Sequence, residues 1–322
     1  MPLEIKNNVK YHIIDEGSDG QKIDNFLLKT LKNVPKSHVY KLLRSGQVRV
    51  NKKRVRTDYR LSINDSVRIP PVSYKDKDTS IVAIASKSQL LDIEKCILHE
   101  DDAFIIINKP CGIAVHGGSG INLGVIELLR QSRPDAKFLE LVHRIDKETS
   151  GILMIAKKRL ALVGIHKQMR EKSIHKKYEV IVNGEWKDKQ RIVDLNLLKT
   201  SDFDGQKKVS VVNDDYKNTN TKKSRSVFFL KKSLKAFTLL EVKLITGRTH
   251  QIRVQLSHLG FPILGDEKYG NFELNKKIKK AGFSRMFLHA SEVAFTHPLN
   301  QEKAHFTAPT PIEFYALEAI NE

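Results

Sequence analysis

The chain has 322 residues, and its 56 Lys and Arg against 37 Asp and Glu give a formal net charge of +19. This length exceeds one small module, and the mixture of 40% hydrophobic and 29% charged residues excludes a disordered chain. No apolar run approaches the roughly eighteen residues of a membrane span. The N-terminus also lacks the apolar stretch of a signal peptide. We therefore expect a soluble, cytoplasmic protein with more than one folded unit.

Cysteine and histidine patterns give no sign of a disulfide framework or a metal site. The two cysteines, Cys96 and Cys111, form no CxxC motif, and the 12 histidines include no HExxH pair. We expect no structural metal and no cofactor. The excess of positive charge is then the strongest compositional signal, and its usual partner is a polyanion.

The positive charge is concentrated near the N-terminus. Residues 1–75 hold 16 Lys or Arg and 7 Asp or Glu, a net charge of +9, while the remaining 247 residues carry +10. Almost half of the excess thus lies in less than a quarter of the chain. This asymmetry predicts a separate, more basic N-terminal unit.

The pattern of this unit predicts two helices followed by strands. Apolar residues at helical spacing indicate a helix over 23–31, and a second helix begins at Pro35 and ends before Gly46. A strand over 48–51, a basic turn and a strand ending at 67–69 follow. Basic side chains on the second helix and on the turn should form one positive face, although a solvated basic surface without a partner has the same pattern. They are Lys36, Lys41, Arg44, Lys52, Lys53 and Arg54.

The segments Lys22–Phe26, Ser37–Lys52 and Val67–Ile69 resemble an S4 RNA-binding domain over roughly residues 20–70. The resemblance implies a fold that grips structured RNA through its backbone and shape. Residues 1–19 would form an N-terminal extension. Pro70 and Pro71 end the module because proline cannot extend a strand ladder, and the polar residues 71–90 are typical of a linker.

A larger unit is expected over residues 91–322. Apolar runs predict strands at 104–107, 151–156, 178–182 and 239–244, with helices such as 160–171 between them. Irregular alternation of this kind favours an α+β domain over a regular βαβ array. Residues 199–225 are polar, and we expect a partly strand-forming excursion that faces solvent.

The first candidate for chemistry is Lys109, in the run NKPCG that starts at Asn108 immediately after the apolar strand at 104–107. A lysine at a strand end can reach a phosphate, and Gly112 allows close approach of the backbone. An ordinary β-turn has the same pattern.

The second candidate is Asp146, in a charged turn between two apolar segments. Arg144, Lys147 and His143 lie beside it in the sequence. Cationic neighbours favour the ionised carboxylate that a nucleophile or base needs. A salt-bridged structural turn is an equally good interpretation of the pattern alone.

Two further segments carry candidates. On a strand, Tyr178 begins an inward row with Val180 and Val182, which is typical of a core residue but would also let the ring stack on a base. Thr249 is placed to cap a helix that ends before Gly260, with His250 and Arg253 on one face. An arginine fork there suits a carboxylate or a phosphate, although a capped surface helix would have the same sequence.

Together these segments resemble the RluA family of pseudouridine synthases over about residues 95–310. The motifs occur in the family's order, and they are KPCGIAVH from Lys109, HRIDKETSG from His143, Tyr178, GRTHQIR from Gly247, GDEKYG from Gly265 and LHA from Leu288. The family usually continues the fourth motif with histidine, where this chain has Gln255. The resemblance implies a small S4-like domain followed by a mixed, mainly antiparallel sheet with flanking helices and a central active-site cleft.

Residue roles follow from the resemblance. Asp146 matches the family's essential aspartate, Tyr178 the aromatic residue that packs on the target base, and Arg253 the basic partner of the aspartate. Arg144 matches the arginine that fills the gap left by a flipped base. We expect further RNA contacts from Lys109, His116, Arg248 and His250.

The function implied is isomerisation of uridines of 23S ribosomal RNA to pseudouridine by a monomer that needs no redox cofactor, nucleotide or membrane. The target uridine would first be extruded from its stack, at a cost of a few kcal/mol. Two alternatives remain: a synthase of the same family acting on other rRNA or tRNA uridines, and a non-catalytic RNA-binding ribosome assembly factor. The second would show altered residues at 146, 178 or 253, but this chain keeps all three.

Overall fold

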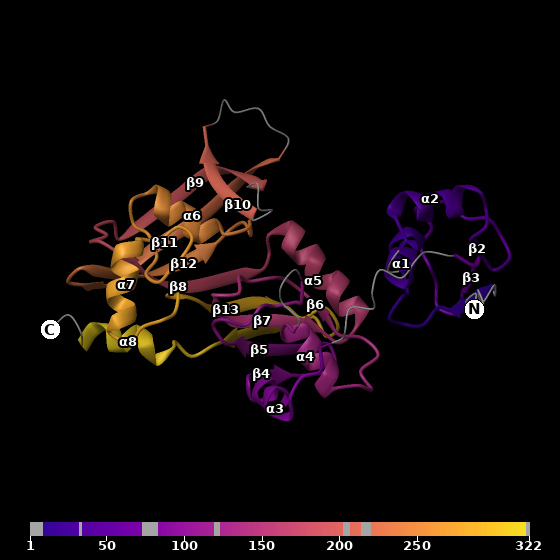
Figure 1. Cartoon of the computed structure of the whole chain (residues 1–322), viewed down its shortest axis with the longest axis horizontal. Coiled ribbons are helices and arrows are strands. Elements are labelled where there is room, and N and C mark those ends of the chain that lie inside the picture. The colour runs from indigo at the N-terminus through magenta and orange to yellow at the C-terminus, as the bar shows by residue number, and fades with distance from the viewer. Residues whose placement is uncertain are drawn as a thin grey trace, which may run out of the picture. The chain divides into compact units, whose positions relative to one another are not determined.

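The computed structural model describes residues 9–31, 34–72, 83–118, 123–201, 207–213 and 220–319 (Figure 1). The chain divides into two compact units, Met1–Ile84 and Ala85–Glu322. No helix in these described ranges is long and apolar enough to cross a membrane.

The first unit packs two helices on a small antiparallel sheet. Its core contains the apolar face predicted for the first helix, with Ile23, Phe26 and Leu27 buried. The sheet has the order β1-β3-β2, so the strand nearest the N-terminus is an edge strand of the unit. The elements are β1 (Lys10–Ile13), α1 (Ile23–Thr30), α2 (Lys36–Arg44), β2 (Arg49–Val50) and β3 (Ser66–Ile69).

Two segments beside the predicted S4-like domain are more structured than expected. Within the expected N-terminal extension, β1 pairs with β3 and the adjacent Ile14 is 1% exposed, because the core needs a third strand to cover it. The predicted linker is also too long. Ser86 and Gln89 form a capping box that starts a helix inside it, so the second unit already begins at Ala85. Most of the linker, residues 73–82, lies outside the described residues.

In the described part of the second unit, eleven strands form one mixed sheet that is mainly antiparallel, as predicted. The main path is β10-β9-β11-β12-β8-β13-β7-β5-β4; β14 pairs with β13 and β6 with β7. Among these strands, β13 and β7 run parallel. The strands are β4 (Ile97–Glu100), β5 (Phe104–Lys109), β6 (Glu140–Leu141), β7 (Ser150–Ala156), β8 (His175–Asn183), β9 (Gln190–Ser201), β10 (Lys207–Val212), β11 (Thr221–Leu234), β12 (Phe237–Leu244), β13 (Leu288–Thr296) and β14 (Lys303–Thr307).

Helices cover both faces of this sheet, because alternate residues of its strands point to opposite sides. On β5, Ile105 and Ile107 pack in one core with α3 and α4, whereas Phe104 and Ile106 pack in another with α5. In the other half, α6 packs on one face of β8 and α7 and α8 on the opposite face. The helices are α3 (Lys87–Lys95), α4 (Val125–Ser132), α5 (Arg159–Glu171), α6 (Gln251–His258), α7 (Phe272–Lys280) and α8 (Ile312–Ala319).

The predicted excursion at 199–225 forms strand as expected, in the ends of β9, β10 and β11. It does not face solvent throughout, since Val209 of β10 is buried against Leu197 of β9 and Val254 of α6. Residues 202–206 and 214–219 of this region lie outside the described residues.

Candidate active site and nucleic-acid interface

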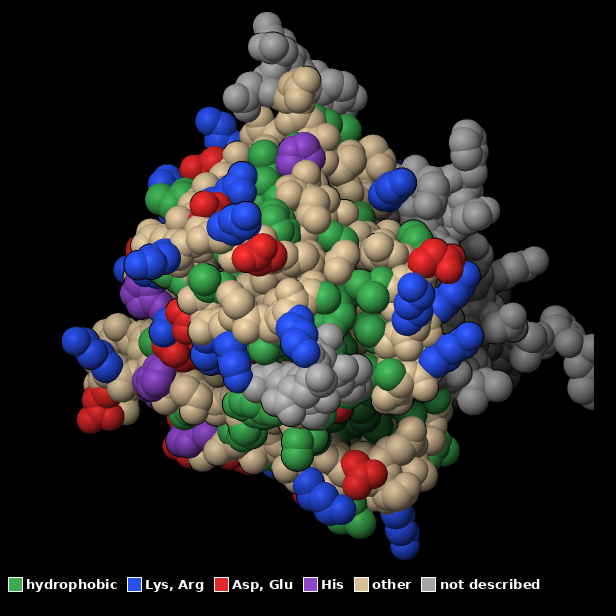
Figure 2. All heavy atoms as spheres, turned by 90° about the vertical axis from the view of Figure 1, so that its left-hand side faces the viewer, with side chains coloured by type: hydrophobic (Ala, Val, Ile, Leu, Met, Phe, Trp, Pro, Cys, Tyr) green, Lys and Arg blue, Asp and Glu red, His purple; other side chains and the backbone are tan. Residues whose placement is uncertain are grey.

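A large cleft of about 1660 Å³ opens in the second unit. Its walls come from the loop before β7, the start of β8, the end of β12 and the N-terminal half of α6. Nine Lys or Arg residues line it against two acidic residues, Asp146 and Glu148. This cleft favours a polyanion. On the face shown in Figure 2, by contrast, Lys and Arg are dispersed among acidic and hydrophobic side chains.

Asp146 lies in the cleft, in the loop between β6 and β7. Its Oδ2 accepts a hydrogen bond from Arg253 Nη1 at 2.9 Å. Its Oδ1 lies 3.8 Å from His250 Nε2, too far for a hydrogen bond. The side chain is 26% exposed. One carboxylate oxygen is thus anchored and the other is left facing the cleft.

Arg253 is held rigidly behind Asp146. Its Nε and Nη2 groups donate to the two oxygens of Asp266, both at 2.8 Å, in a bidentate fork. Asp266 also accepts the backbone N–H groups of Lys268 and Tyr269, and its side chain is 1% exposed. Burial alone would lower the pKa of Arg253, but the hydrogen bonds and charges of Asp266 and Asp146 raise it above its usual value. The guanidinium therefore stays charged and oriented toward Asp146.

His250 is positioned by Tyr269. The His250 Nδ1 and the Tyr269 hydroxyl are 2.8 Å apart, and the same hydroxyl accepts the backbone N–H of Val209. Burial lowers the pKa of His250, which favours the neutral imidazole. Asp266 and Tyr269 were not among the sequence candidates. Their signal was the GDEKYG motif, which places them three residues apart in one turn.

Tyr178 forms part of the apolar wall of the cleft. It is 8% exposed and packs in the core with Val180 and Val182, the inward row that the strand pattern predicts. Burial, with a contribution from the charge of Asp146, raises the pKa of its phenol. The phenol therefore stays protonated at neutral pH. Leu288 and Ile252 line the cleft on the same wall.

Lys109 does not reach the cleft, and its predicted phosphate contact is wrong. The residue is 0% exposed, and its ammonium donates to the carbonyl oxygens of Pro110, Ile113 and Lys147 at 2.7 to 2.9 Å. Burial lowers the pKa of Lys109 to about 8. All three N–H groups of this buried ammonium are used in these hydrogen bonds, so none is left for a ligand. Lys109 instead joins the loop after β5 to the loop that carries Asp146.

The remaining second-unit candidates are exposed. Arg144, His116 and Arg248 all line the cleft. Arg248 Nε donates to the carbonyl oxygen of Lys223, so its side chain is anchored at one end. These positions are compatible with RNA contacts.

The predicted Thr249 cap of α6 is wrong. The residue before the helix, His250, has a left-handed φ of 51°, and no side chain caps the helix. Instead, Gln251 Oε1 accepts the Arg248 backbone N–H and the Thr246 hydroxyl. This turn directs His250 toward Asp146. Gln255, where the family usually has histidine, is fully buried and donates to Ser224 Oγ at 3.1 Å.

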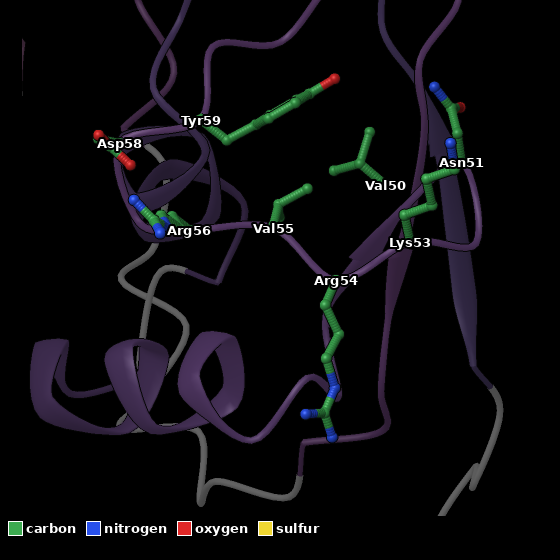
Figure 3. A pocket seen from close by; sticks show the side chains of 8 residues that line it. All are labelled: Val50, Asn51, Lys53, Arg54, Val55, Arg56, Asp58 and Tyr59. Carbon is green, nitrogen blue, oxygen red and sulfur yellow. The ribbon is translucent and has the colours of Figure 1, made fainter.

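The six basic candidates of the first unit are all exposed, on α2 and on the turn after β2. The turn borders a pocket of about 460 Å³. Figure 3 shows Val50, Val55 and Tyr59 directed toward one another inside it, with Arg54 extending away. Arg54 packs over Gly46 and donates to the Ser45 carbonyl, which ties the turn to the end of α2. The unit thus presents basic side chains in water around a small apolar hollow.

Comparison with known proteins places both units. Residues 103–258 match a family model described as RNA pseudouridylate synthase, and residues 21–67 match the S4 domain. A protein of Buchnera aphidicola named "Ribosomal large subunit pseudouridine synthase C" is 48% identical over 303 residues, which cover 94% of each chain. A Haemophilus influenzae protein of the same name is 45% identical over 94% of this chain and 92% of its own.

Solved structures show the same fold. "Human RNA Pseudouridylate Synthase Domain Containing 4" superimposes with a TM-score of 0.58 at 24% identity, covering 73% of this chain and 96% of its own. "Human RNA Pseudouridylate Synthase Domain Containing 1" gives 0.55 at 24% identity over 67% of this chain and 83% of its own. At this identity the likeness concerns the fold alone.

Proposed function

Because the chain belongs to the RluA-type family of RNA pseudouridine synthases and carries an S4 domain, we propose that it isomerises specific uridines of 23S ribosomal RNA to pseudouridine. The relatives that are 45 to 48% identical over nearly their whole length are named for the large ribosomal subunit, which supports this target. The substrate is the large subunit RNA or its precursor, and the enzyme acts in the cytoplasm as a monomer.

The observation that carries the proposal is the geometry of Asp146. Arg253 anchors Oδ2 at 2.9 Å, while Oδ1 faces the cleft without a hydrogen bond among the described residues. A carboxylate that is oriented by one oxygen and free at the other is prepared to act as a nucleophile or a base. Asp146 is therefore the proposed catalytic residue, and Arg253 its partner.

The reaction breaks the N1–C1′ glycosidic bond, rotates the uracil and forms a C5–C1′ bond. The C5 hydrogen leaves as a proton and N1 gains one, so the reaction is redox-neutral and needs no cofactor. The free oxygen of Asp146 can attack the sugar, attack the base or take the proton at C2′. The bound geometry of the uridine decides among these routes.

Tyr178 packs against the extruded uracil in this proposal. Its ring belongs to the apolar wall, and its raised pKa keeps the hydroxyl protonated at neutral pH, so it does not act as a phenolate base. Arg144, exposed at the cleft, fills the space that the uridine leaves in the RNA. The first unit holds structured RNA through its exposed basic face.

Substitution of Asp146 by Asn tests the proposal. Tritium release from C5-labelled uridine in a 23S transcript should be lost, because the amide has neither the charge nor the basicity of the carboxylate. Asp194→Asn is the matched control, since Asp194 is an exposed partner of Arg225 on β9 and should leave the rate unchanged. Retained activity in a folded Asp146→Asn protein would refute the assignment.

Mapping pseudouridines in a deletion strain tests the target. Loss of modification at 23S sites supports the proposal, and loss at other rRNA or tRNA sites supports the related-synthase alternative. Unchanged modification everywhere, with a defect only in subunit assembly, supports the non-catalytic alternative.

A further inference from the structure

Two consecutive lysines, Lys176 and Lys177, follow the first residue of β8 and point to opposite sides of the sheet. Lys176 shares the cleft side with Tyr178, two residues along, and both line the cleft. Lys177 points to the other side, where its Nζ lies 3.2 Å from Glu292 and 3.7 Å from Glu241. One lysine therefore has two carboxylate partners, and its neighbour faces the proposed substrate.

Lys176 has no hydrogen-bond acceptor or carboxylate partner among the described residues, although its side chain is partly buried. Arg253, a buried cation of the same cleft, has two carboxylates. Burial lowers the pKa of Lys176, with no acidic group to offset it. A buried ammonium normally has a counter-ion, because removing it from water is costly.

The surroundings of Lys176 leave room for a ligand, and none of the described carboxylates forms an ion pair with it. His143, which also lines the cleft, has a pKa lowered to about 3 by burial, with a contribution from the charge of Lys176, so this imidazole is neutral. On another side lies Gly247 of the GRTHQIR motif. A Cβ placed on Gly247 would lie 3.7 Å from Lys176 Nζ, with no closer described atom beyond the neighbouring residues of the chain. The ammonium thus lies beside exposed backbone of this motif, where the packing is open.

We propose that Lys176 is a phosphate-binding residue of the cleft, whose ammonium pairs with a backbone phosphate flanking the extruded uridine. This assignment rests on the proposed function, since it takes the ligand to be RNA. A phosphate supplies the full negative charge that the protein withholds, and a lysine ammonium binds it as a point charge. Asp146 and Tyr178 then act on the uridine while Lys176 holds its backbone beside them.

The test compares Lys176→Met with Lys177→Met in the full-length protein. Methionine keeps the length of the side chain and removes the charge. For Lys176→Met, the Kd for a 23S fragment should rise by roughly tenfold, the size of one charge-assisted hydrogen bond. The slope of log Kd against log salt should fall by about one unit. Lys177→Met should change neither, and equal effects of the two substitutions would overturn the proposal.

Neutral phosphates separate a phosphate contact from a contact with a uracil oxygen. Two substrates carry a methylphosphonate on the 5′ or the 3′ side of the target uridine. At one of these positions, the methylphosphonate should raise the Kd of the wild-type protein as much as Lys176→Met does with the unmodified RNA. Lys176→Met measured on that methylphosphonate RNA should then show no larger rise in Kd than either change alone. Additive losses at both positions would overturn the proposal.

If Lys176→Met fails to fold, binding of the wild-type protein to the two methylphosphonate substrates still tests the proposal. Lys176→Arg, which keeps the charge, should retain the salt dependence of the Kd. Failure of the two proposals is also distinguishable. If the wild-type protein forms pseudouridine while the Lys176 arms show no effect, only the phosphate contact is refuted. If it binds the RNA without forming pseudouridine, the proposed function is refuted.

Discussion

The basic surface of the first unit and the cleft of the second contain the same types of side chain, lysine and arginine, but the first exposes them to solvent and the second buries some of them. On α2 and on the turn after β2, lysines and arginines are exposed to water, where ions screen their charges. In the cleft, Arg253 is 8% exposed and forms ion pairs with Asp146 and Asp266. Exposed charges attract RNA at long range with little positional accuracy. Buried charges, by contrast, hold a reacting group in one orientation.

This difference predicts how each region responds to substitution. A solvated charge contributes little to stability and acts additively in binding. A buried charge is costly to remove singly, because its partner is left without compensation. The buried network should therefore fail when one member is changed, whereas the surface should weaken in small steps.

The largest expected effect is that of Asp266→Asn. The amide cannot accept both hydrogen bonds of the Arg253 fork, and it leaves that guanidinium with less compensation. The free energy of unfolding should fall by about 3 kcal/mol, and single-turnover rates should fall about 100-fold as Asp146 loses its orientation. Denaturant titration and tritium release measure the two.

Glu273→Gln is the control for this prediction, because Glu273 pairs with Lys276 on exposed α7. Its unfolding free energy should change by less than about 0.5 kcal/mol. Similar losses in the two variants would contradict the contrast between buried and exposed pairs.

A smaller effect concerns acid. Burial lowers the pKa of His289 to about 4. In the neutral, fully buried ring, Nε2 donates to the Ala308 carbonyl oxygen and Nδ1 accepts from the Ser150 hydroxyl. Between about pH 4 and 6.5 the unfolded chain binds a proton at this residue that the folded chain does not. Its contribution to stability is therefore complete above pH 6.5 and is lost as the pH falls toward 4.

His289→Asn should flatten the pH dependence of the unfolding free energy in this window by up to about 1.4 kcal/mol per pH unit. Urea titrations at half-unit intervals measure it. His258→Asn, which changes an exposed histidine at the end of α6, should leave the slope as it is. An unchanged slope in His289→Asn would show that this ring titrates alike in both states.

The smallest effect is expected on the first unit. Lys41→Gln combined with Lys53→Gln should lower the salt slope of RNA binding by about two units, one for each phosphate contact. The rate at saturating RNA should stay the same, because neither side chain lines the cleft. Lys279→Gln combined with Lys280→Gln, on α7, is the control. A loss of saturated rate in the first pair would break the division of roles.

Much of the fold and part of the site were predictable from local patterns. The α+β class, α1, α2, α5 and the strand row of Tyr178 follow from hydrophobic periodicity, which is a local property. The motifs of the RluA resemblance also led to Asp146 and Arg253. Their side chains lie 2.9 Å apart although the residues are 107 positions apart in the sequence, and no local periodicity predicts a contact over that separation.

The failures share a physical origin. Lys109 was interpreted as a phosphate ligand because its position at a strand end is local information, whereas its three carbonyl acceptors come from two separate loops. Thr249 was assigned as a cap because the composition fits, but a left-handed residue at His250 displaces the helix start. Residues 10–13 have a short strand pattern that becomes meaningful only through pairing with β3.

The net charge of +19, its division between two regions and the motif order are properties of the sequence alone. They determined that a basic RNA-binding unit precedes an RluA-type synthase domain. Tertiary structure decided which charges are solvated and which are buried, because burial and pairing depend on segments brought together from across the chain. It placed Asp266 behind Arg253 and withdrew Lys109 from the cleft. It also left Lys176 facing that cleft without a counter-ion among the described residues.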